Sequence, residues 1–301
     1  LLGQMLAPRG KMPKVITELL SQIQAREVSW LWEQRIPTNR FALLQGDPGV
    51  GKSFILAALV AALTGKGQLP HKPIHQVRMA LVLADEDTAE EVLRPRMELL
   101  GADLDRVRVM RGFVDENGRE FAFNLLRWYN EFVECVMEVK PEIVVIDPII
   151  NFSGGNDTNK ADQVNSLLTP IVHMAEKLGF TLLGSLHSNK SAQKALYKGQ
   201  GSLQYIASAR STFLVAKDPS DSFGEEKVLC HVKSNYSKLT PSMNFVIADT
   251  PKGPTITWGE EGKWNPDDLL QEESEDLGGP VATEKGYLMG FFDGRQGKVS
   301  F

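Results

Sequence analysis

Residues 41–63 read FALLQGDPGVGKSFILAALVAAL, and this stretch decides the fold. An apolar strand at 41–44 leads into a glycine-rich turn at 46–53, and an apolar helix follows at 54–63. The turn matches G-x-x-x-x-G-K-[ST], the P-loop pattern, in the strand–turn–helix setting that the pattern requires. Its glycines let backbone N–H groups surround a phosphate, and the helix N-terminus adds positive partial charge.

The residues of this turn have separate predicted roles in binding ATP together with Mg²⁺. Lys52 is expected to reach the β- and γ-phosphate oxygens, and Ser53 to supply one oxygen ligand to Mg²⁺. Nucleotide contacts are predicted for the whole turn and the next helical residue, that is for Gly46, Asp47, Pro48, Gly49, Val50, Gly51, Lys52, Ser53 and Phe54.

Two further carboxylates follow apolar strands. Asp147 ends the strand IVVI, where it can hold Mg²⁺ through water. A proline comes directly after it, so the carboxylate that activates water cannot stand beside Asp147. Glu86, just after the strand ALVLA, is the best candidate for this general base, because we expect that strand to lie next to the P-loop strand. Asp85 and Asp87 stay open as alternative bases, or as charges at a helix N-terminus.

Strands and helices alternate along the chain, which indicates an α/β fold with a mostly parallel twisted sheet flanked by helices. After residue 212, short strands separated by turns predict an antiparallel extension at the C-terminal edge of the sheet. Further helices are expected at 161–178 and 202–209. Three more are an amphipathic one through Val15, Leu19, Leu20 and Ile23, one from the capping box at 88–91 to Leu100, and one at 121–139.

Five stretches together resemble the RepA-type branch of RecA-fold ATPases, in the RecA/DnaB/KaiC superfamily. They are WLWEQRIPTNRFALLQGDPGVGKS, LVLADEDTAEEVLRPRMELLG, IVVIDPIINFSGGNDTN, LLGSLHSNKS and ARSTFLVAKDP. Here the glutamate follows a different strand from the metal-binding acid, and this placement is similar to that class. AAA+ motors instead carry consecutive Asp-Glu. The resemblance implies three parts: an N-terminal helical segment (1–27), a RecA-like ATPase core (28–259), and an acidic linker with a C-terminal remnant (260–301).

The resemblance also implies roles for three residues outside the P-loop. His187 closes the strand TLLGSLH and would sense the γ-phosphate. Arg210 resembles an arginine finger that reaches the nucleotide of a neighbouring subunit. Lys233, with Asn235 two residues later, resembles a K-x-R or K-x-N element that approaches the same phosphates. The alternatives are a hydrogen-bonded histidine at a strand end and cations in surface ion pairs.

Charge is unevenly distributed over the chain. Residues 259–276 hold eight acids and one lysine, a net of −7, so the rest carries +2 of the total charge of −5. Residues 188–217 contain no acid. In the resembled helicases two loops face the ring channel, here about 151–163 and 188–201. The second carries the predicted DNA contacts Lys190, Lys194, Tyr197 and Lys198, which suit backbone phosphates and base stacking. A solvated loop is the alternative.

These patterns predict an ATP-hydrolysing motor on DNA: a ring-forming replicative helicase or translocase of plasmid or phage type. A RecA/KaiC-like DNA-binding or assembly-switch protein without unwinding activity is the alternative. The expected partners are single-stranded DNA, further copies of the chain in a hexamer, and a primase or replication initiator. The longest apolar run has ten residues, too short to span a bilayer, and only two cysteines occur. A cytoplasmic protein without membrane contact is therefore expected.

Overall fold

The computed structural model describes residues 16–70, 75–121, 124–153, 161–187, 200–266 and 268–269. Its strands are β1 (Trp30–Trp32), β2 (Ile36–Pro37), β3 (Phe41–Gly46), β4 (Ala80–Ala84), β5 (Val107–Val109), β6 (Phe113–Val114), β7 (Glu120–Phe121), β8 (Ile143–Asp147), β9 (Thr181–His187), β10 (Ser211–Lys217), β11 (Glu226–Ser234), β12 (Ser242–Thr250) and β13 (Gly253–Gly262). The α-helices are α1 (Lys52–Thr64), α2 (Arg94–Leu99), α3 (Tyr129–Val139), α4 (Ala161–Leu178) and α5 (Gln200–Ser208). Three short 3-10 helices and one π-helix complete the elements: η1 (Leu20–Gln22), η2 (Ala89–Leu93, the π-helix), η3 (Leu104–Arg106) and η4 (Ile149–Ser153).

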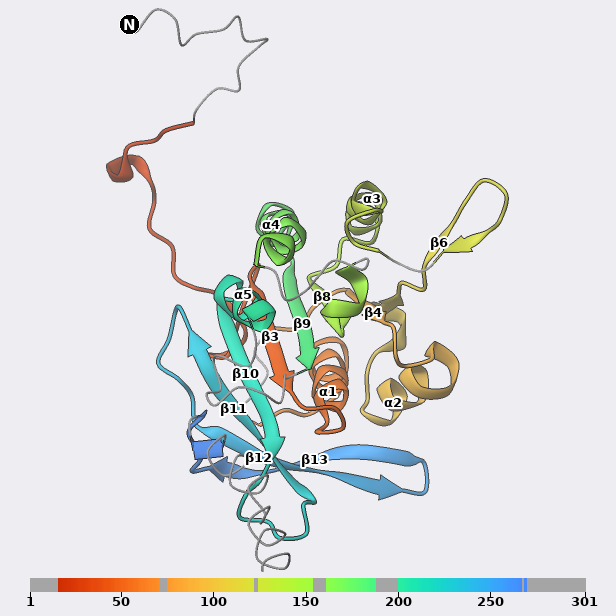
Figure 1. Ribbon diagram of the computed structural model, residues 1–301, viewed down its shortest axis with the longest axis vertical. Helices are drawn as coiled ribbons and strands as arrows, with labels where there is room; N and C mark the ends of the chain where they lie inside the picture. Colours follow the sequence, from red (N-terminus) through yellow and green to blue (C-terminus); the bar gives the residue numbers. More distant parts are fainter. Residues whose placement is uncertain are drawn as a thin grey trace, which may run out of the picture.

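One nine-stranded sheet organises the fold, in the order β13-β12-β11-β10-β3-β9-β8-β4-β5 (Figure 1). The strands from β10 to β5 run parallel, and β11, β12 and β13 add antiparallel strands at one edge. The predicted α/β fold with an antiparallel C-terminal extension is therefore confirmed.

The expected position of β4 is wrong. The P-loop strand β3 lies between β9 and β10, and β4 pairs with β8 instead. Both neighbours of β3 come from much later in the chain. The apolar pattern of a strand shows that it is buried, but β3, β4, β8, β9 and β10 are all largely buried on both faces, so the pattern cannot order them.

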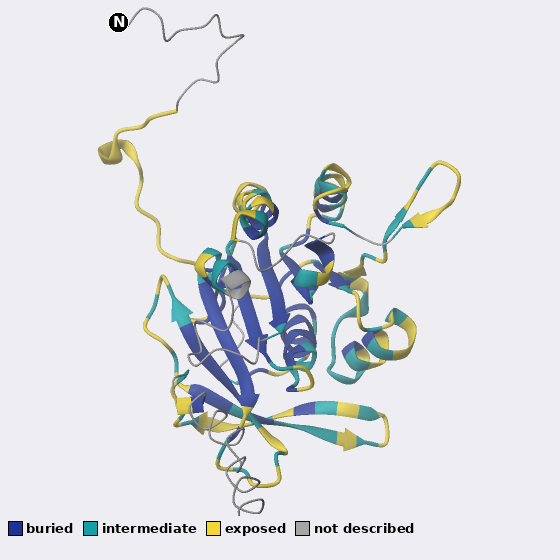
Figure 2. Ribbon diagram, viewed as in Figure 1, coloured by how far each residue is buried: buried dark blue, intermediate teal, exposed yellow. Residues whose placement is uncertain are grey.

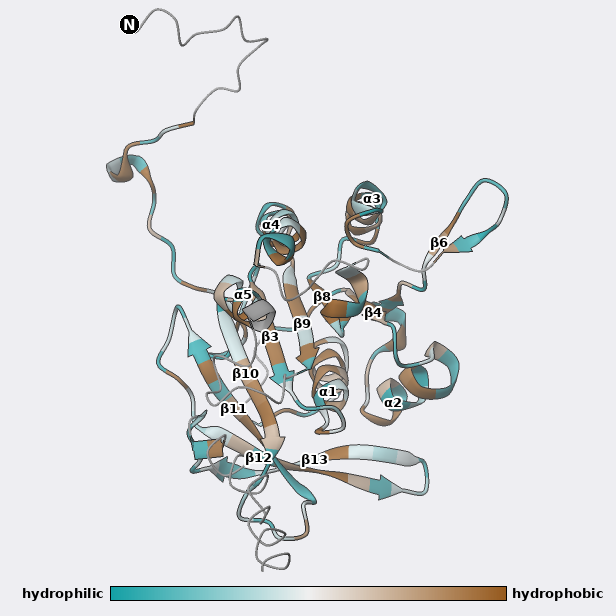
Figure 3. Ribbon diagram, viewed as in Figure 1, coloured by the Kyte–Doolittle hydropathy of each residue, from teal (hydrophilic) through white to brown (hydrophobic). Residues whose placement is uncertain are grey.

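Helices cover both faces of the parallel strands. Alternate residues of β3 point to opposite layers: Ala42 and Leu44 pack in the cluster with α1 and α2, and Phe41 and Leu43 in the cluster with α3, α4 and α5. The strands are buried, whereas the outer sides of α3 and α4 are exposed and hydrophilic (Figures 2 and 3). The core therefore lies in two apolar layers, one on each side of the sheet.

Helix α1 is apolar on all sides. The β12–β13 hairpin covers the side of α1 that the parallel strands leave uncovered. All residues from 55 to 64 are buried. Phe245 on β12 packs in the same cluster as α1, and Trp258 on β13 packs against that cluster. A helix without a polar face needs such cover on every side. The antiparallel extension thus holds the helix that begins at the P-loop.

The expected N-terminal amphipathic helix is absent from residues 16–29; Val15 lies outside the described part of the chain. Only the 3-10 turn η1 forms, and Leu19, Leu20 and Ile23 are exposed. This segment leads away from the sheet (Figure 1). A short helix is marginally stable in water unless its apolar face is packed, and no element of the described chain packs against this one.

One predicted helix start is right in position but differs in its hydrogen bonds, and another is wrong. The helix after β4 begins as the π-helix η2, and its N-cap Thr88 makes no side-chain hydrogen bond, so no capping box forms. Pro95 disturbs the α-helical hydrogen bonds of the same segment, because it has no N–H to donate and its ring crowds the carbonyl one turn earlier. The helix predicted at 121–139 begins at Tyr129. Before it, β6 and β7 form a hairpin whose Phe113 and Phe121 rings lie on Trp128.

The described start of the predicted acidic linker is packed rather than solvated. Asp218, which is 3% exposed, accepts hydrogen bonds from Trp264 Nε1 (3.1 Å) and Asn244 Nδ2 (2.8 Å). Leu269 is buried against Leu214 and other side chains of β10 and β11. The core thus continues to at least Leu269. No helix in the described part of the chain is long and apolar enough to span a membrane.

Candidate active site

The P-loop connects the C-terminal end of β3 to α1. Gly46 ends β3, and a Cβ atom there would lie 2.2 Å from the carbonyl oxygen of Val215 on β10. Gly51 is the N-cap of α1 with φ +100°, and a Cβ atom there would lie 2.9 Å from Ile247 Cδ1 on β12. Only glycine fits at both positions. Strands β10 and β12 therefore lie directly against the loop and restrict the conformation of its backbone.

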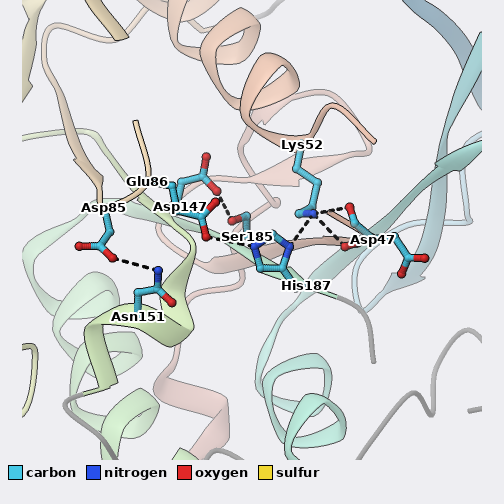
Figure 4. A network of polar contacts seen from close by, with 9 residues as sticks. Asp47, Lys52, Asp85, Glu86, Asp147, Asn151, Ser185 and His187 are labelled. Atoms are coloured by element: carbon cyan, nitrogen blue, oxygen red, sulfur yellow. Dashed lines mark hydrogen bonds and ion pairs between the residues drawn. The ribbon is translucent and has the colours of Figure 1, made fainter. Parts of the chain in front are cut away.

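Lys52 is buried inside this loop and points toward its carbonyl groups. Its Nζ donates to Gly46 O and Asp47 O, both at 2.8 Å, and lies 3.1 Å from His187 Nδ1 (Figure 4). Burial lowers the pKa of Lys52 to about 8, although the nearby carboxylates of Asp147, Asp47 and Glu86 raise it in part. A cation that faces only carbonyls and a histidine is placed to exchange these contacts for phosphate oxygens.

His187 connects Lys52 to the acidic segment after β4. It pairs with Gly46 across β3 and β9, which fixes it beside the P-loop. While Nδ1 faces Lys52, Nε2 lies 3.3 Å from Glu86 Oε1. The imidazole thus bridges the P-loop lysine and the predicted base.

The three consecutive acids after β4 have three different partners. Asp85 Oδ2 accepts a hydrogen bond from Asn151 Nδ2 at 2.9 Å. Glu86 faces His187, and Asp87 forms an ion pair with Arg96 on α2. Only the middle acid therefore contacts the histidine that lies against the P-loop lysine. This arrangement favours Glu86 over its neighbours as the general base.

Asp147 lies between the acidic segment and the P-loop. Ala84 pairs with Asp147 across β4 and β8, and Asp85 N donates to Asp147 O at 3.2 Å. On its other side, Ser185 Oγ donates to Asp147 Oδ1 (Figure 4). In the strand order, β9 and β8 therefore lie between the P-loop strand β3 and β4, the strand that Glu86 follows. Glu86 reaches the site without direct pairing between β4 and β3.

Ser185 is a site residue that the sequence reasoning missed. A signal was present, because Ser185 and His187 stand two residues apart in an apolar strand and so face the same side of the sheet. A polar side chain two residues before a functional strand end predicts a contact in the same site.

The residues around the P-loop fit a nucleotide bound together with Mg²⁺. Ser53, at the start of α1, and Asp147 line one small cavity, and Asp47 Oδ1 is buried without a hydrogen-bond partner in the described chain. No three His, Cys, Asp or Glu side chains of the described residues come close enough to enclose a metal by themselves. That pattern suits Mg²⁺, which usually takes one or two carboxylates, with phosphates and water as the remaining ligands.

Arg210 lies at the opposite end of the sheet from the P-loop. Its N–H donates to Phe41 O at 2.7 Å, at the start of β3, whereas Gly46 is five residues further along the strand. Five residues of strand span about 17 Å. Arg210 therefore cannot reach a nucleotide on its own P-loop. Its Nε is buried and has no hydrogen-bond partner in the described chain.

Lys233 lies close to Arg210 but has partners within its own chain. Its Nζ donates to the carbonyl oxygens of Ile206 (2.8 Å), Ala207 (3.0 Å) and Ala209 (2.7 Å), at the C-terminal end of α5. Burial, with a smaller effect of the Arg210 charge, lowers the pKa of Lys233. Lys233 thus caps a helix, a contact that it would have to leave to approach a phosphate.

The predicted DNA-binding residues lie outside the described chain. Lys190, Lys194, Tyr197 and Lys198 all belong to the segment 188–199, and of the first predicted loop, 154–160 is likewise not described. Their role stays a prediction. The described ends of both segments reach the site, since His187 and Asn151 contact Glu86 and Asp85.

A family model described as an AAA domain, AAA_25, matches residues 7–193. The chain belongs to this family. The match covers more than half of the chain and includes the P-loop, the acidic segment after β4, Asp147 and His187. These parts of the candidate site thus lie within one AAA domain, whereas Arg210 and Lys233 lie beyond the matched residues.

Among solved structures, this chain is similar to a KaiC-like protein, PH0186, from the hyperthermophilic archaeon Pyrococcus horikoshii OT3. The TM-score is 0.54 with 16% sequence identity, over 76% of this chain and 99% of that chain. At this identity the likeness shows the fold, which is the RecA/KaiC-like fold of P-loop ATPases. No curated protein matches the sequence.

Proposed function

We propose that this chain hydrolyses ATP with Mg²⁺ and uses the reaction to act on single-stranded DNA, as a ring-forming replicative helicase or translocase of the RepA type. The observation that carries the proposal is the contact series Lys52–His187–Glu86. It joins a P-loop lysine, a candidate general base and the residue directly before segment 188–199, where the lysines with predicted DNA contacts lie. His187 thus contacts two groups of the nucleotide site and directly precedes the candidate DNA-binding segment.

Each residue of the site has a distinct task in this proposal. Lys52 and the P-loop N–H groups bind phosphate oxygens, and Ser53 and Asp147 would hold Mg²⁺, which neutralises phosphate charge when bound. Glu86 accepts a proton from the attacking water. Ser185 holds the Asp147 carboxylate in one orientation, and His187 responds to the position of Lys52. We assign Arg210 to the nucleotide of an adjacent copy, because it cannot reach its own.

The second candidate function is an ATP-controlled binding or assembly protein that separates no strands. The observation that favours it is the P-loop lysine held by its own loop carbonyls and by His187. Such an arrangement can switch with nucleotide whether or not a motor step follows. Both functions share the ATP site; they differ in what happens to duplex DNA.

The test is ATP hydrolysis with and without single-stranded DNA, together with unwinding of tailed duplexes. We expect DNA to stimulate turnover severalfold and the chain to separate tailed duplexes under conditions in which electron microscopy shows rings. Lys52→Ala serves as the control that removes both nucleotide binding and turnover. Rings that bind DNA without unwinding would favour the second function, and a chain that neither binds nor hydrolyses ATP would exclude both. A hexamer, a primase or initiator partner and a cytoplasmic location stay predictions.

The lowered pKa of Lys52 predicts that ATP binding near pH 8 takes up a proton. Only the ammonium form attracts phosphate, so bound ATP raises this pKa again, and about half a proton is taken up at pH 8. ATP affinity is expected to fall as the pH rises from about 7 to about 9, because Lys52 loses its charge over this range.

Calorimetry in buffers with different ionisation enthalpies measures this uptake. The matched control is Lys52→Arg, whose guanidinium stays charged and should take up no proton. A wild-type affinity that stays constant over this pH range would contradict the prediction by itself, as would equal proton uptake by both chains.

A further inference from the structure

Asp87, the third acid after β4, is held by a side chain from α2. Arg96 Nη1 donates to Asp87 Oδ2, and both side chains are largely buried, 13% and 23% exposed. The Arg96 guanidinium also lies over the Phe54 ring, 4.2 Å from its centroid. Phe54 follows Ser53 in the first turn of α1. Arg96 therefore joins the acidic segment to the residue next to a predicted metal ligand.

The same pair borders the cavity that the two predicted magnesium ligands border. The polar lining residues are Ser53, Asp87, Arg96 and Asp147, and the rest of the wall is apolar. Its volume is about 10 Å³, room for about one water molecule. Arg96 donates to Oδ2 of Asp87, and an ionised carboxylate has several acceptor sites, so Asp87 can also accept a hydrogen bond from a molecule in this space.

We propose that Asp87 forms part of the metal site, where its carboxylate accepts a hydrogen bond from a water molecule bound to Mg²⁺, and that Arg96, through its ion pair with Asp87, offsets part of the negative charge that favours the ion. The inference rests on the proposed nucleotide site and adds two residues to it. Mg²⁺ in proteins usually keeps several of its water ligands, and carboxylates near it commonly bind those waters instead of the ion.

The proposal makes a prediction about the sign of two charge effects. In a partly buried site, a carboxylate close to a divalent cation favours its binding, and a guanidinium at similar distance opposes it. Removing the Asp87 charge should therefore weaken metal binding, whereas removing the Arg96 charge should strengthen it. A pair that served only to stabilise the fold would show no such opposition, because breaking it from either side would disturb the site in the same way.

The experiment measures Mn²⁺ binding to the full chain saturated with ADP, by electron paramagnetic resonance of free Mn²⁺. We expect Asp87→Asn to weaken Mn²⁺ binding by about 3- to 10-fold and Arg96→Gln to strengthen it by about 3- to 10-fold. The matched control is Arg94→Gln, the same charge change on the same helix at an exposed position, which should shift the constant by less than about twofold. The double variant should return to within about twofold of the wild-type value.

Opposite shifts of the two single variants support the proposal. Shifts in the same direction, or no shift beyond that of Arg94→Gln, overturn it. If either single variant does not fold, Asp87→Ser and Arg96→Met repeat the test, since methionine keeps an apolar contact with Phe54. Wild-type chain that binds no Mn²⁺ with ADP would overturn the proposed nucleotide site as well, whereas normal wild-type binding with unshifted variants rejects only the roles of Asp87 and Arg96.

Discussion

Replacing Glu86 with Gln is expected to lower kcat for ATP hydrolysis by about 10²- to 10⁴-fold, the usual contribution of a general base. The amide keeps the size of the side chain and one oxygen toward His187, but it cannot take a proton from water. ATP affinity should change by less than about threefold, because Glu86 is assigned no phosphate contact. Phosphate release gives kcat, and a fluorescent ATP analogue gives the binding constant.

Asp85→Asn is the matched control for this substitution. It is the same chemical change one residue away, in a side chain that faces Asn151 instead of His187. We expect it to lower kcat by less than about 10-fold, because the amide can still accept the Asn151 hydrogen bond. The assignment of Glu86 fails if Glu86→Gln turns over normally and Asp85→Asn does not, since that result would identify Asp85 as the base.

The P-loop was predictable because its geometry is local. Strand, turn and helix follow one another within residues 41–64, and Gly46, Gly51, Lys52 and Ser53 each have a backbone or chemical reason to stand where they do. The ends of β8 and β9 were predictable for the same reason. An apolar strand that stops at Asp147 or His187 places that residue at the carboxyl edge of the sheet, wherever the strand stands in the order.

The strand order was not predictable, because it depends on contacts between distant parts of the chain. Val144 in β8 and Leu182 in β9 are equally apolar and could pair with β3 on pattern alone. The prediction of Glu86 nonetheless does not depend on pairing between β4 and β3. β4 pairs with β8 at Ala84 and Asp147, and β9 places His187 between Glu86 and Lys52.

Pattern rules failed where another residue competed with the regular hydrogen bonds or packing of the expected helix. The capping box at Thr88 satisfied the pattern, but Pro95 changes the hydrogen bonding of the turn that follows. The helix expected from residue 121 loses its first turns to a hairpin whose Phe113 and Phe121 rings pack on Trp128. In both cases the apolar spacing was compatible with a helix, and the deciding interaction was one that apolar spacing alone does not reveal.

The second large effect is expected at the far end of the sheet, in Arg210→Ala. If Arg210 acts on the nucleotide of an adjacent copy, its loss should lower turnover of the assembled protein by about 10³-fold or more. Nucleotide affinity of the isolated subunit should stay unchanged, because about 17 Å of strand separates Arg210 from its own P-loop. Arg40→Gln is the matched control: Arg40 stands at the same end of the sheet, where it donates to Tyr236 Oη at 3.0 Å, and it should retain turnover within a few-fold.

Mixing two inactive variants separates an action in trans from a structural effect. In an assembly of Arg210→Ala and Lys52→Ala subunits, some interfaces combine the intact P-loop of the first with the intact arginine of the second. Random mixing at equal amounts makes roughly one interface in four complete, so about a quarter of wild-type turnover should return. A structural role for Arg210 gives no such recovery, because each damaged subunit stays damaged in the mixture. Absence of recovery in mixtures shown by affinity-tag capture to contain both variants would therefore remove Arg210 from the active site of the neighbour.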